Sequence, residues 1–230
     1  MKPPLAVIVA VLALAAGTVV CAQFGFDPDK VIPGGGIHVQ GWTGKIDASS
    51  ARQGRKLEDA KFSQEGNALH VTSGPATTFW NPANRAVGDY TIKGTFLEPK
   101  FMDLNSHPHS YGIVIGGNDM GTDKMSLVYC AAYGDGTAFV RGFGPAVFNM
   151  LGARPFPSVG KAAGIGQPVK QEIAWIVKSG KAECSINGAV IASYTSDQLV
   201  TAGKLTSLDG VFGIRLTHNV DTIITGFGKN

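Results

Sequence analysis

The chain has 230 residues, with 31 glycines, 12 prolines and 44% hydrophobic residues, which suits one domain with a sizeable core. Only 16% of the residues are charged, and the formal net charge is +3 without any block of like charges. Nucleic acid is therefore excluded as an expected partner, because binding it usually takes a clustered basic face.

Residues 1–22 have the pattern of a secretory signal peptide. Lys2 precedes the apolar stretch LAVIVAVLALAA at 5–16, and VCA at 20–22 fits the small-x-small pattern before a cleavage site, which we place after Ala22. An uncleaved membrane anchor and lipid attachment at Cys21 are the alternatives. Cleavage predicts a secreted or periplasmic protein that is not attached to a membrane.

Cleavage leaves two cysteines, Cys130 and Cys184. Two cysteines in an oxidising compartment favour a disulfide. Each lies inside a predicted strand, however, and a bridge would require those two strands to be adjacent. We therefore favour two small buried thiols over a disulfide.

Residues 23–36 predict an extended leader, because Asp27-Pro28, Pro33 and three glycines at 34–36 disfavour regular structure. Residues 37–230 are expected to form a single domain. It begins with a strand at 38–42 and one helical turn near 49–53.

Short strands separated by turns follow from residue 61 onward. The clearest alternation is DYTIKGTFL at 89–97, and Asn187-Gly188 between apolar runs is a strong hairpin signal. A strand at 77–80 is expected to stop at Asn81-Pro82. The other expected strands are 61–63, 68–72, 111–115, 125–133, 137–141, 172–177, 181–186, 189–194, 211–217 and 222–227.

Residues 142–168 predict a long irregular segment with one short helix at 145–150. Such a segment inside a compact domain is often a binding lip, and a solvated linker is the alternative. The whole pattern predicts an all-β sandwich or barrel.

Three stretches resemble concanavalin A-like jelly rolls. They are GPATTFWNPANRAVGDYTIKGTF at 74–96, HSYGIVIGGNDM with SLVYCAAYGDGTAFVR at 109–141, and VKSGKAECSINGAVIASY followed by GVFGIRLTHNVDTIITGFG at 177–228. The last stretch has the order Asn-Gly, apolar strand, then G-x-x-G-[IL]-R, which is frequent in laminin G-like and related jelly rolls. The sequence is similar in pattern to uncharacterised secreted bacterial proteins with a 3-keto-disaccharide hydrolase-like domain. The resemblance implies a sandwich of two antiparallel sheets with at most one or two short helices.

The sequence contains no catalytic motif that we can identify. Family 16-type glucanases of this fold carry E-x-D-x-x-E, and none of the five glutamates here has an acid two and five positions on. Whether the protein is an enzyme therefore stays open, with a glycoside hydrolase as the expected class if it is one.

Histidines form the most conspicuous polar motif, His107-Pro108-His109. Proline favours an extended path, so the two imidazoles can point the same way and bind a sugar hydroxyl or a metal. A metal would need a third ligand, for which Asp103 and His218 are the candidates. We favour solvated loop histidines and expect no metal or other cofactor.

Calcium is an alternative to the absence of a metal. Asn118, Asp119 and Asp123 offer oxygen atoms, although their spacing does not match an EF-hand loop. We assign them no role in the predicted ligand site.

An aromatic platform is the remaining candidate site. Sugar rings present C–H groups that pack on aromatic faces, while their hydroxyls need planar polar partners. A competing interpretation places Trp80 and Tyr111 in the core. The candidate ligand-binding residues, histidines included, are Trp80, Asn81, His107, His109, Tyr111, Tyr133, Arg141 and His218.

The sequence thus predicts a secreted, lectin-like, non-catalytic protein that binds a glycan or polysaccharide on its concave sheet or at residues 142–168. One alternative is a glycoside hydrolase acting on keto-disaccharides or other glycans. Another is a structural, self-associating surface protein, which low charge and high glycine content would suit.

Overall fold

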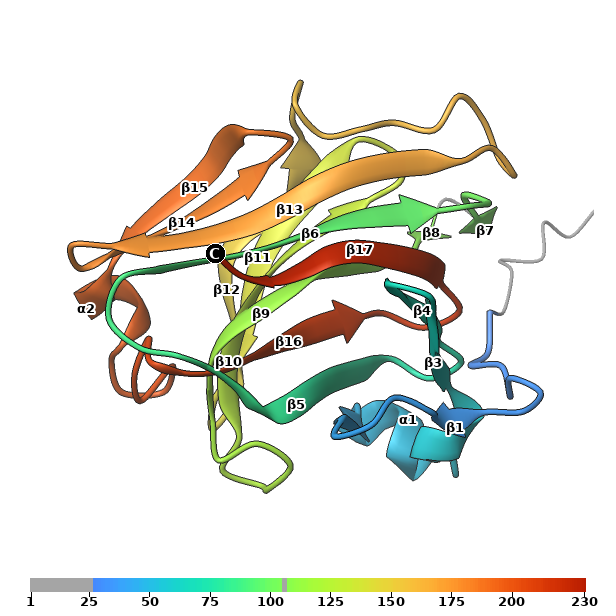
Figure 1. Ribbon diagram of the computed structural model, residues 1–230, viewed down its shortest axis with the longest axis horizontal. Helices are drawn as coiled ribbons and strands as arrows, with labels where there is room; N and C mark the ends of the chain where they lie inside the picture. Colours follow the sequence, from blue (N-terminus) through green and yellow to red (C-terminus); the bar gives the residue numbers. More distant parts are fainter. Residues whose placement is uncertain (1–26, 105–106) are drawn as a thin grey trace, which may run out of the picture.

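The computed structural model describes residues 27–104 and 107–230. For residues 103, 104, 107 and 108 it describes the backbone alone. Two large β-sheets pack face to face, and Figure 1 shows β6 (Tyr90–Glu98), β13 (Val169–Lys178) and β17 (Asp221–Lys229) crossing in front of the second sheet. The predicted signal peptide, Cys21 and residues 23–26 lie outside the described residues. No helix in the described part of the chain is both long and apolar enough to cross a membrane.

The first sheet has eight strands in the order β1-β3-β4-β17-β6-β13-β14-β15. All neighbours pair antiparallel except β1, which runs parallel to β3. The strands not yet bounded are β1 (Gly36–Ile37), β3 (Lys61–Glu65), β4 (Ala68–Thr72), β14 (Lys181–Ile186) and β15 (Ala189–Thr195).

The second sheet has seven antiparallel strands in the order β12-β11-β10-β9-β16-β5-β2. The short remaining elements are two α-helices, a 3-10 turn and a two-stranded ribbon. The seven strands are β2 (Thr43–Ile46), β5 (Thr77–Ala86), β9 (Ser110–Asn118), β10 (Ser126–Tyr133), β11 (Thr137–Phe143), β12 (Val147–Pro155) and β16 (Gly210–Leu216). The short elements are α1 (Ala48–Arg52), η1 (Leu57–Asp59), β7 (Asp103–Leu104), β8 (His107–Pro108) and α2 (Ser196–Leu199).

The core lies between the two sheets because each strand alternates its side chains between faces. In β6 the residues Tyr90, Ile92, Gly94 and Phe96 are buried, as the alternation at 89–97 predicts, and Glu98 continues the same buried face. Phe96 stacks on Tyr111 from the opposite sheet, with ring centroids 5.4 Å apart. The predicted all-β sandwich with only short helices is therefore confirmed.

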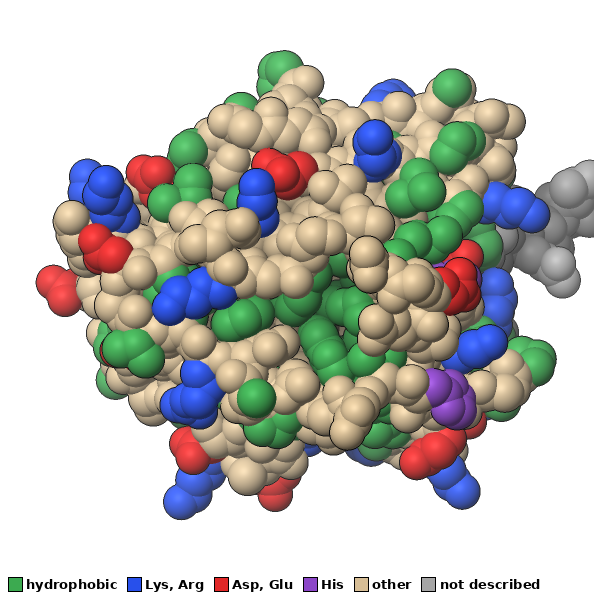
Figure 2. All heavy atoms as spheres, viewed as in Figure 1, with side chains coloured by type: hydrophobic (Ala, Val, Ile, Leu, Met, Phe, Trp, Pro, Cys, Tyr) green, Lys and Arg blue, Asp and Glu red, His purple; other side chains and the backbone are tan. Residues whose placement is uncertain are grey.

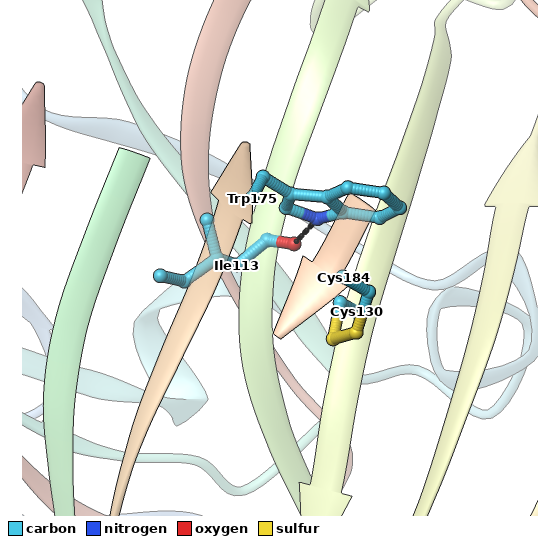
Figure 3. The surroundings of a disulfide bond; sticks show 4 residues. All are labelled: Ile113, Cys130, Trp175 and Cys184. Atoms are coloured by element: carbon cyan, nitrogen blue, oxygen red, sulfur yellow. Dashed lines mark hydrogen bonds between the residues drawn. A yellow bond between two sulfur atoms is a disulfide. The ribbon is translucent and has the colours of Figure 1, made fainter. Parts of the chain in front are cut away.

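A disulfide joins the two sheets and corrects the prediction of free thiols (Figure 3). Cys130 on β10 and Cys184 on β14 both point into the core, with their Cα atoms 6.0 Å apart. Beside the bridge, Nε1 of Trp175 donates to the carbonyl of Ile113 at 3.0 Å, another link between sheets. The prediction required adjacent strands, whereas these two strands face each other across the sandwich.

The structure corrects one predicted strand near the amino end of the domain and the predicted end of another. Residues 38–42 form a turn, in which Gly41 takes a φ of +79° and the amide of Trp42 donates to the carbonyl of Val39. The strand expected to end at Trp80 continues as β5 to Ala86. Residues 81–84 bulge out opposite Phe212 of β16, so Pro82 sits where no ladder hydrogen bond is needed.

The predicted helix at 145–150 is also wrong. Residues 147–155 form β12, which pairs with β11 along the edge of the seven-stranded sheet. An isolated helix of six residues has little stability of its own, whereas pairing with β11 satisfies the backbone of this segment. The irregular region expected at 142–168 is correspondingly shorter.

Candidate functional site

The seven-stranded sheet has an outer face, turned away from the core, across which one residue of each strand lines up in a row. The strand register aligns one residue from each strand in this row, and neighbouring residues along each strand point into the core. From one edge to the other the row is Thr43, Trp80, Gly213, Val114, Tyr129, Arg141 and Asn149.

Four aromatic rings gather on the outer face over β10 and β11. Tyr129 meets Phe139 edge to face at 5.7 Å and stacks on Phe143 at 5.9 Å, while Tyr133 lies 5.2 Å from Phe139. The guanidinium of Arg141 lies over the Phe139 ring, 4.8 Å from its centroid. These contacts fix the rings in place, so the face is preorganised.

Arg215 links this aromatic cluster to α1. Its Nη1 donates to Oδ1 of Asp47 at 2.7 Å, and its Nη2 pairs with the second oxygen. The guanidinium also lies over the rings of Tyr129 and Phe143, at 5.6 and 5.0 Å from their centroids. Burial, the largest single influence, lowers the pKa of Arg215, but Asp47 and Tyr129 together outweigh it and raise that pKa, so the group stays charged.

A hollow of about 400 Å³, here called the outer hollow, opens between this face and the residues around α1. A second hollow of about 440 Å³ adjoins it, and the two share Asp47, Ser49, Phe143 and Val147. Aromatic rings and hydrogen-bonding groups both line the outer hollow. Its lining includes Tyr129, Tyr133, Phe143, Arg141, Gln53 and Asp29.

Three of the predicted ligand-binding residues line the outer hollow: Tyr133, Arg141 and His218. All three are partly exposed. Burial raises the pKa of the Tyr133 hydroxyl, although Arg141 acts in the opposite direction, so the hydroxyl stays protonated and can donate a hydrogen bond.

The other predicted aromatic residues lie elsewhere. Tyr111 faces the core, is fully buried, and accepts a hydrogen bond from Nε2 of Gln171 at 2.9 Å. Trp80 is on the outer face but only 4% exposed, because Gly121 lies against its indole ring. Asn81 belongs to the bulge of β5, where its Oδ1 accepts from the amide of Ala83. These three do not join Tyr133 and Arg141 in one site.

The structure brings two of the predicted histidines together and adds two aspartates from the leader. The rings of His109 and His218 are 4.5 Å apart. Nε2 of His109 is 2.8 Å from Oδ2 of Asp27, and Nδ1 of His218 is 3.1 Å from Oδ1 of Asp29. His109 is buried rather than solvated, contrary to the prediction. The side chain of His107 lies outside the described residues.

Two of the three residues considered for calcium have other partners. Nδ2 of Asn118 donates to the carbonyls of Gly116 and Asp209 at 3.1 Å each. Asp123 is fully exposed and lies 3.7 Å from Nζ of Lys45. Among the described residues, the side chains grouped closely enough to hold a metal are Asp27, His109 and His218 instead.

Sequence reasoning missed Tyr129, Arg215 and Asp47. Tyr129 was within reach, because it shares the alternation phase of Tyr133 in the same strand. Arg215 is the arginine of the G-x-x-G-[IL]-R motif, which in the sequence indicates only the fold. Asp47 gave no signal, since only folding places it against Arg215.

A separate opening lies on the face seen in Figure 2, where hydrophobic side chains floor a central depression. A hollow of about 450 Å³ there lies beside β17. Its lining combines Trp42 and Phe227 with the amides of Gln40, Gln64 and Asn67. None of the predicted ligand-binding residues lines it.

Comparison of the sequence with protein-family models and with curated proteins gives no match. Solved structures do match. The carbohydrate-binding module CBM66 from Bacillus subtilis has a TM-score of 0.54 at 9% identity, covering 83% of this chain and 95% of that one. An endo-beta-1,3-glucanase from Pyrococcus furiosus has a TM-score of 0.54 at 9% identity, covering 84% and 88%.

A laminarinase from Flavobacterium sp. UMI-01 has the same TM-score of 0.54, at 10% identity, and covers 86% of this chain and 95% of that one. Identities this low establish the fold alone. The chain is therefore a concanavalin A-like jelly-roll β-sandwich, as the resemblance in its sequence implied.

Proposed function

We propose that this protein binds carbohydrate in the outer hollow without cleaving it. The observation that carries the proposal is the lining itself. Partly exposed Tyr133 and Phe143 offer ring faces, and Arg141 and Asp29 offer planar hydrogen-bonding groups beside them. Pyranose and furanose rings need both, because their C–H faces are apolar and their hydroxyls are polar.

Glycans are also the natural first probes for this fold. The structurally similar proteins include a carbohydrate-binding module and two enzymes named for glucan substrates. The choice of hydroxylated ligands rests on the residues of the outer hollow, and the neighbours only guide the panel, which should include β-1,3-glucans.

Binding is favoured over hydrolysis by the state of the carboxylates in the outer hollow. Asp47 is held by Arg215 at 2.7 Å, and Asp29 by His218 at 3.1 Å. Arg215 occupies both oxygens of Asp47, so this carboxylate is not placed to contact a glycosidic oxygen as the general acid of glycoside hydrolysis must.

We further infer that the protein works outside the cytoplasm. The signal-peptide pattern at residues 1–22 and the disulfide between Cys130 and Cys184 both favour an oxidising compartment. Cell fractionation that located the processed chain in the cytoplasm would contradict this inference.

The test is a glycan array followed by titration calorimetry with the strongest hit. Tyr133→Ala and Arg141→Ala should each weaken binding about tenfold or more, because each removes a ring face or a charged hydrogen-bond donor. Arg154→Ala is the matched control, since Arg154 also covers a phenylalanine ring, at 5.1 Å, but lies outside the outer hollow.

Each other outcome points away from the proposal. Binding that survives both variants but is lost on Trp42→Ala would move the site to the opening beside β17. Release of reducing sugar from a bound glycan would favour the hydrolase alternative. A blank array with concentration-dependent assembly of the protein would favour the structural alternative.

A further inference from the structure

A cluster of two histidines and one aspartate lies where the leader meets two loops of the sandwich. Nε2 of His109 is 2.8 Å from Oδ2 of Asp27, and Nε2 of His218 is 3.8 Å from the same oxygen. One ligand atom from each residue lies within 4.8 Å of the other two. Donor atoms around a tetrahedral ion are ~3.3 Å apart, so movements of about an ångström suffice to bring the three to that spacing.

Neighbouring side chains already orient two of these three residues. Nδ1 of His218 can donate to Oδ1 of Asp29 at 3.1 Å, and in that tautomer Nε2, which is 3.8 Å from Oδ2 of Asp27, is the nitrogen that would bind an ion. Nδ2 of Asn219 donates to Oδ1 of Asp27 at 2.7 Å, so the other oxygen of Asp27 faces the histidines. Outer carboxylates and amides of this kind orient ligands in metal centres.

Burial shields the cluster from bulk water while leaving one side accessible. The side chains of His109, Asp27 and His218 are 1%, 9% and 20% exposed, respectively. His218 and Asp29 also line the outer hollow. An ion held by the three ligands would keep a coordination position for water or for a ligand on the side of the hollow.

We propose that Asp27, His109 and His218 bind a divalent transition-metal ion. Zinc suits this donor set well, because two imidazoles and one carboxylate are its ordinary ligands at sites that keep an open position. Calcium and magnesium prefer sets made wholly of oxygen. The proposal does not depend on glycan binding, because the three ligand atoms come from Asp27, His109 and His218 alone, although His218 and Asp29 also line the outer hollow.

The test is calorimetric titration of Zn²⁺ alone into tag-free protein that has been treated with EDTA and dialysed. We expect one zinc ion per chain and a Tm that rises with zinc concentration, because only the folded state assembles the site. Co²⁺ in place of zinc should give the visible absorption of a nitrogen- and oxygen-coordinated tetrahedral ion. Failure of the wild-type protein to bind zinc would overturn the proposal.

Variants separate this site from adventitious binding. His109→Ala, His218→Ala and Asp27→Asn should each weaken zinc binding at least about tenfold, and Asp29→Asn should weaken it less. Melting curves will show whether each variant folds. If His109→Ala does not, the less buried His218→Ala and Asp27→Asn decide the question.

His70→Ala is the matched control. Its two ring nitrogens pair with Glu65 at 2.7 Å and Asp221 at 2.9 Å, on opposite sides of the ring, so the carboxylates cannot converge on one ion. Zinc binding should be unchanged in this variant. Undiminished binding in all the ligand variants, or binding of Ca²⁺ without Zn²⁺, would contradict the assignment.

Discussion

Glu98 is a carboxyl group buried at the end of β6, with 1% of its surface exposed. Burial raises its pKa from 4.5 to about 7, while a hydrogen bond from the Met102 amide acts in the opposite direction and Asp221 and Asp135 add to the rise. A carboxyl whose pKa is raised on folding binds its proton more tightly in the folded state. The native protein therefore loses stability as the pH rises from about 4.5 to about 7, and does not regain it above that range.

Glu98→Gln should remove this pH dependence, because glutamine has a similar shape and no ionisable group. The variant should match the wild type near pH 4.5 and exceed its free energy of unfolding by up to about 3 kcal/mol at pH 8. Urea unfolding at pH 4.5, 6 and 8 measures the difference. Glu58→Gln, at an exposed carboxyl, is the control, and a Glu98→Gln difference that stays constant with pH would contradict the prediction.

At the scale of elements, α1 is held against the outer face, next to the edge strand β2, by the ion pair between Arg215 and Asp47, whose side chains are 4% and 27% exposed. Asp47 lies between these two elements, and Arg215 comes from the centre of the sheet on β16. Removing one partner of such a pair leaves the other charge buried without compensation, which costs more than the pair contributes.

Asp47→Asn should therefore lower the free energy of unfolding by about 3 kcal/mol or more. It should also loosen α1 from the sheet, so amide hydrogen exchange at 48–53 should accelerate. Asp123→Asn makes the same chemical change in an exposed pair, 3.7 Å from Lys45, and should alter neither quantity measurably. Equal effects of the two substitutions would show that Arg215 finds another partner.

Strand β12 shows how an element can escape local prediction. Its sequence contains Pro145 just before it and Gly152 within it, and the local pattern favours a short helix followed by a loop. Pairing with β11 makes it a strand of nine residues instead. Two register shifts along this pairing and the exposed Arg154 make the free edge a poor template for another strand.

At the scale of the whole molecule, the disulfide between Cys130 and Cys184 ties one sheet to the other across 54 residues of chain. Its chief effect is on the unfolded chain, whose conformational entropy it restricts. The hydrogen bond from Trp175 to Ile113 lies beside it, so the two sheets are linked twice in one region of the core.

Replacing both cysteines by alanine should lower the free energy of unfolding by about 4 kcal/mol, the value expected for a closed loop of this length. Guanidinium unfolding of the oxidised protein, the reduced protein and the double variant measures the effect. Reduced wild type and variant should agree closely. A double variant as stable as the oxidised protein would mean that the disulfide adds no net stability to the folded state.

The sequence by itself determined the fold class and most of the strands. These features are local: each depends only on residues that are neighbours in the chain. They are the alternation along single strands and the turns at Glu65-Gly66-Asn67, Gly134-Asp135-Gly136 and Asn187-Gly188. Of the residues expected on one sheet face, Tyr133 and Arg141 do share it, because they lie on the two strands of one tight hairpin.

Only the tertiary structure decided which distant residues meet. Asp27 contacts His109, Asp47 contacts Arg215, and Cys130 bonds to Cys184, although each pair is far apart in the chain. These contacts depend on strand order and on which faces of the two sheets oppose each other, neither of which any local pattern encodes. For the same reason Tyr111, which looked like a surface aromatic beside Tyr133, belongs to the core.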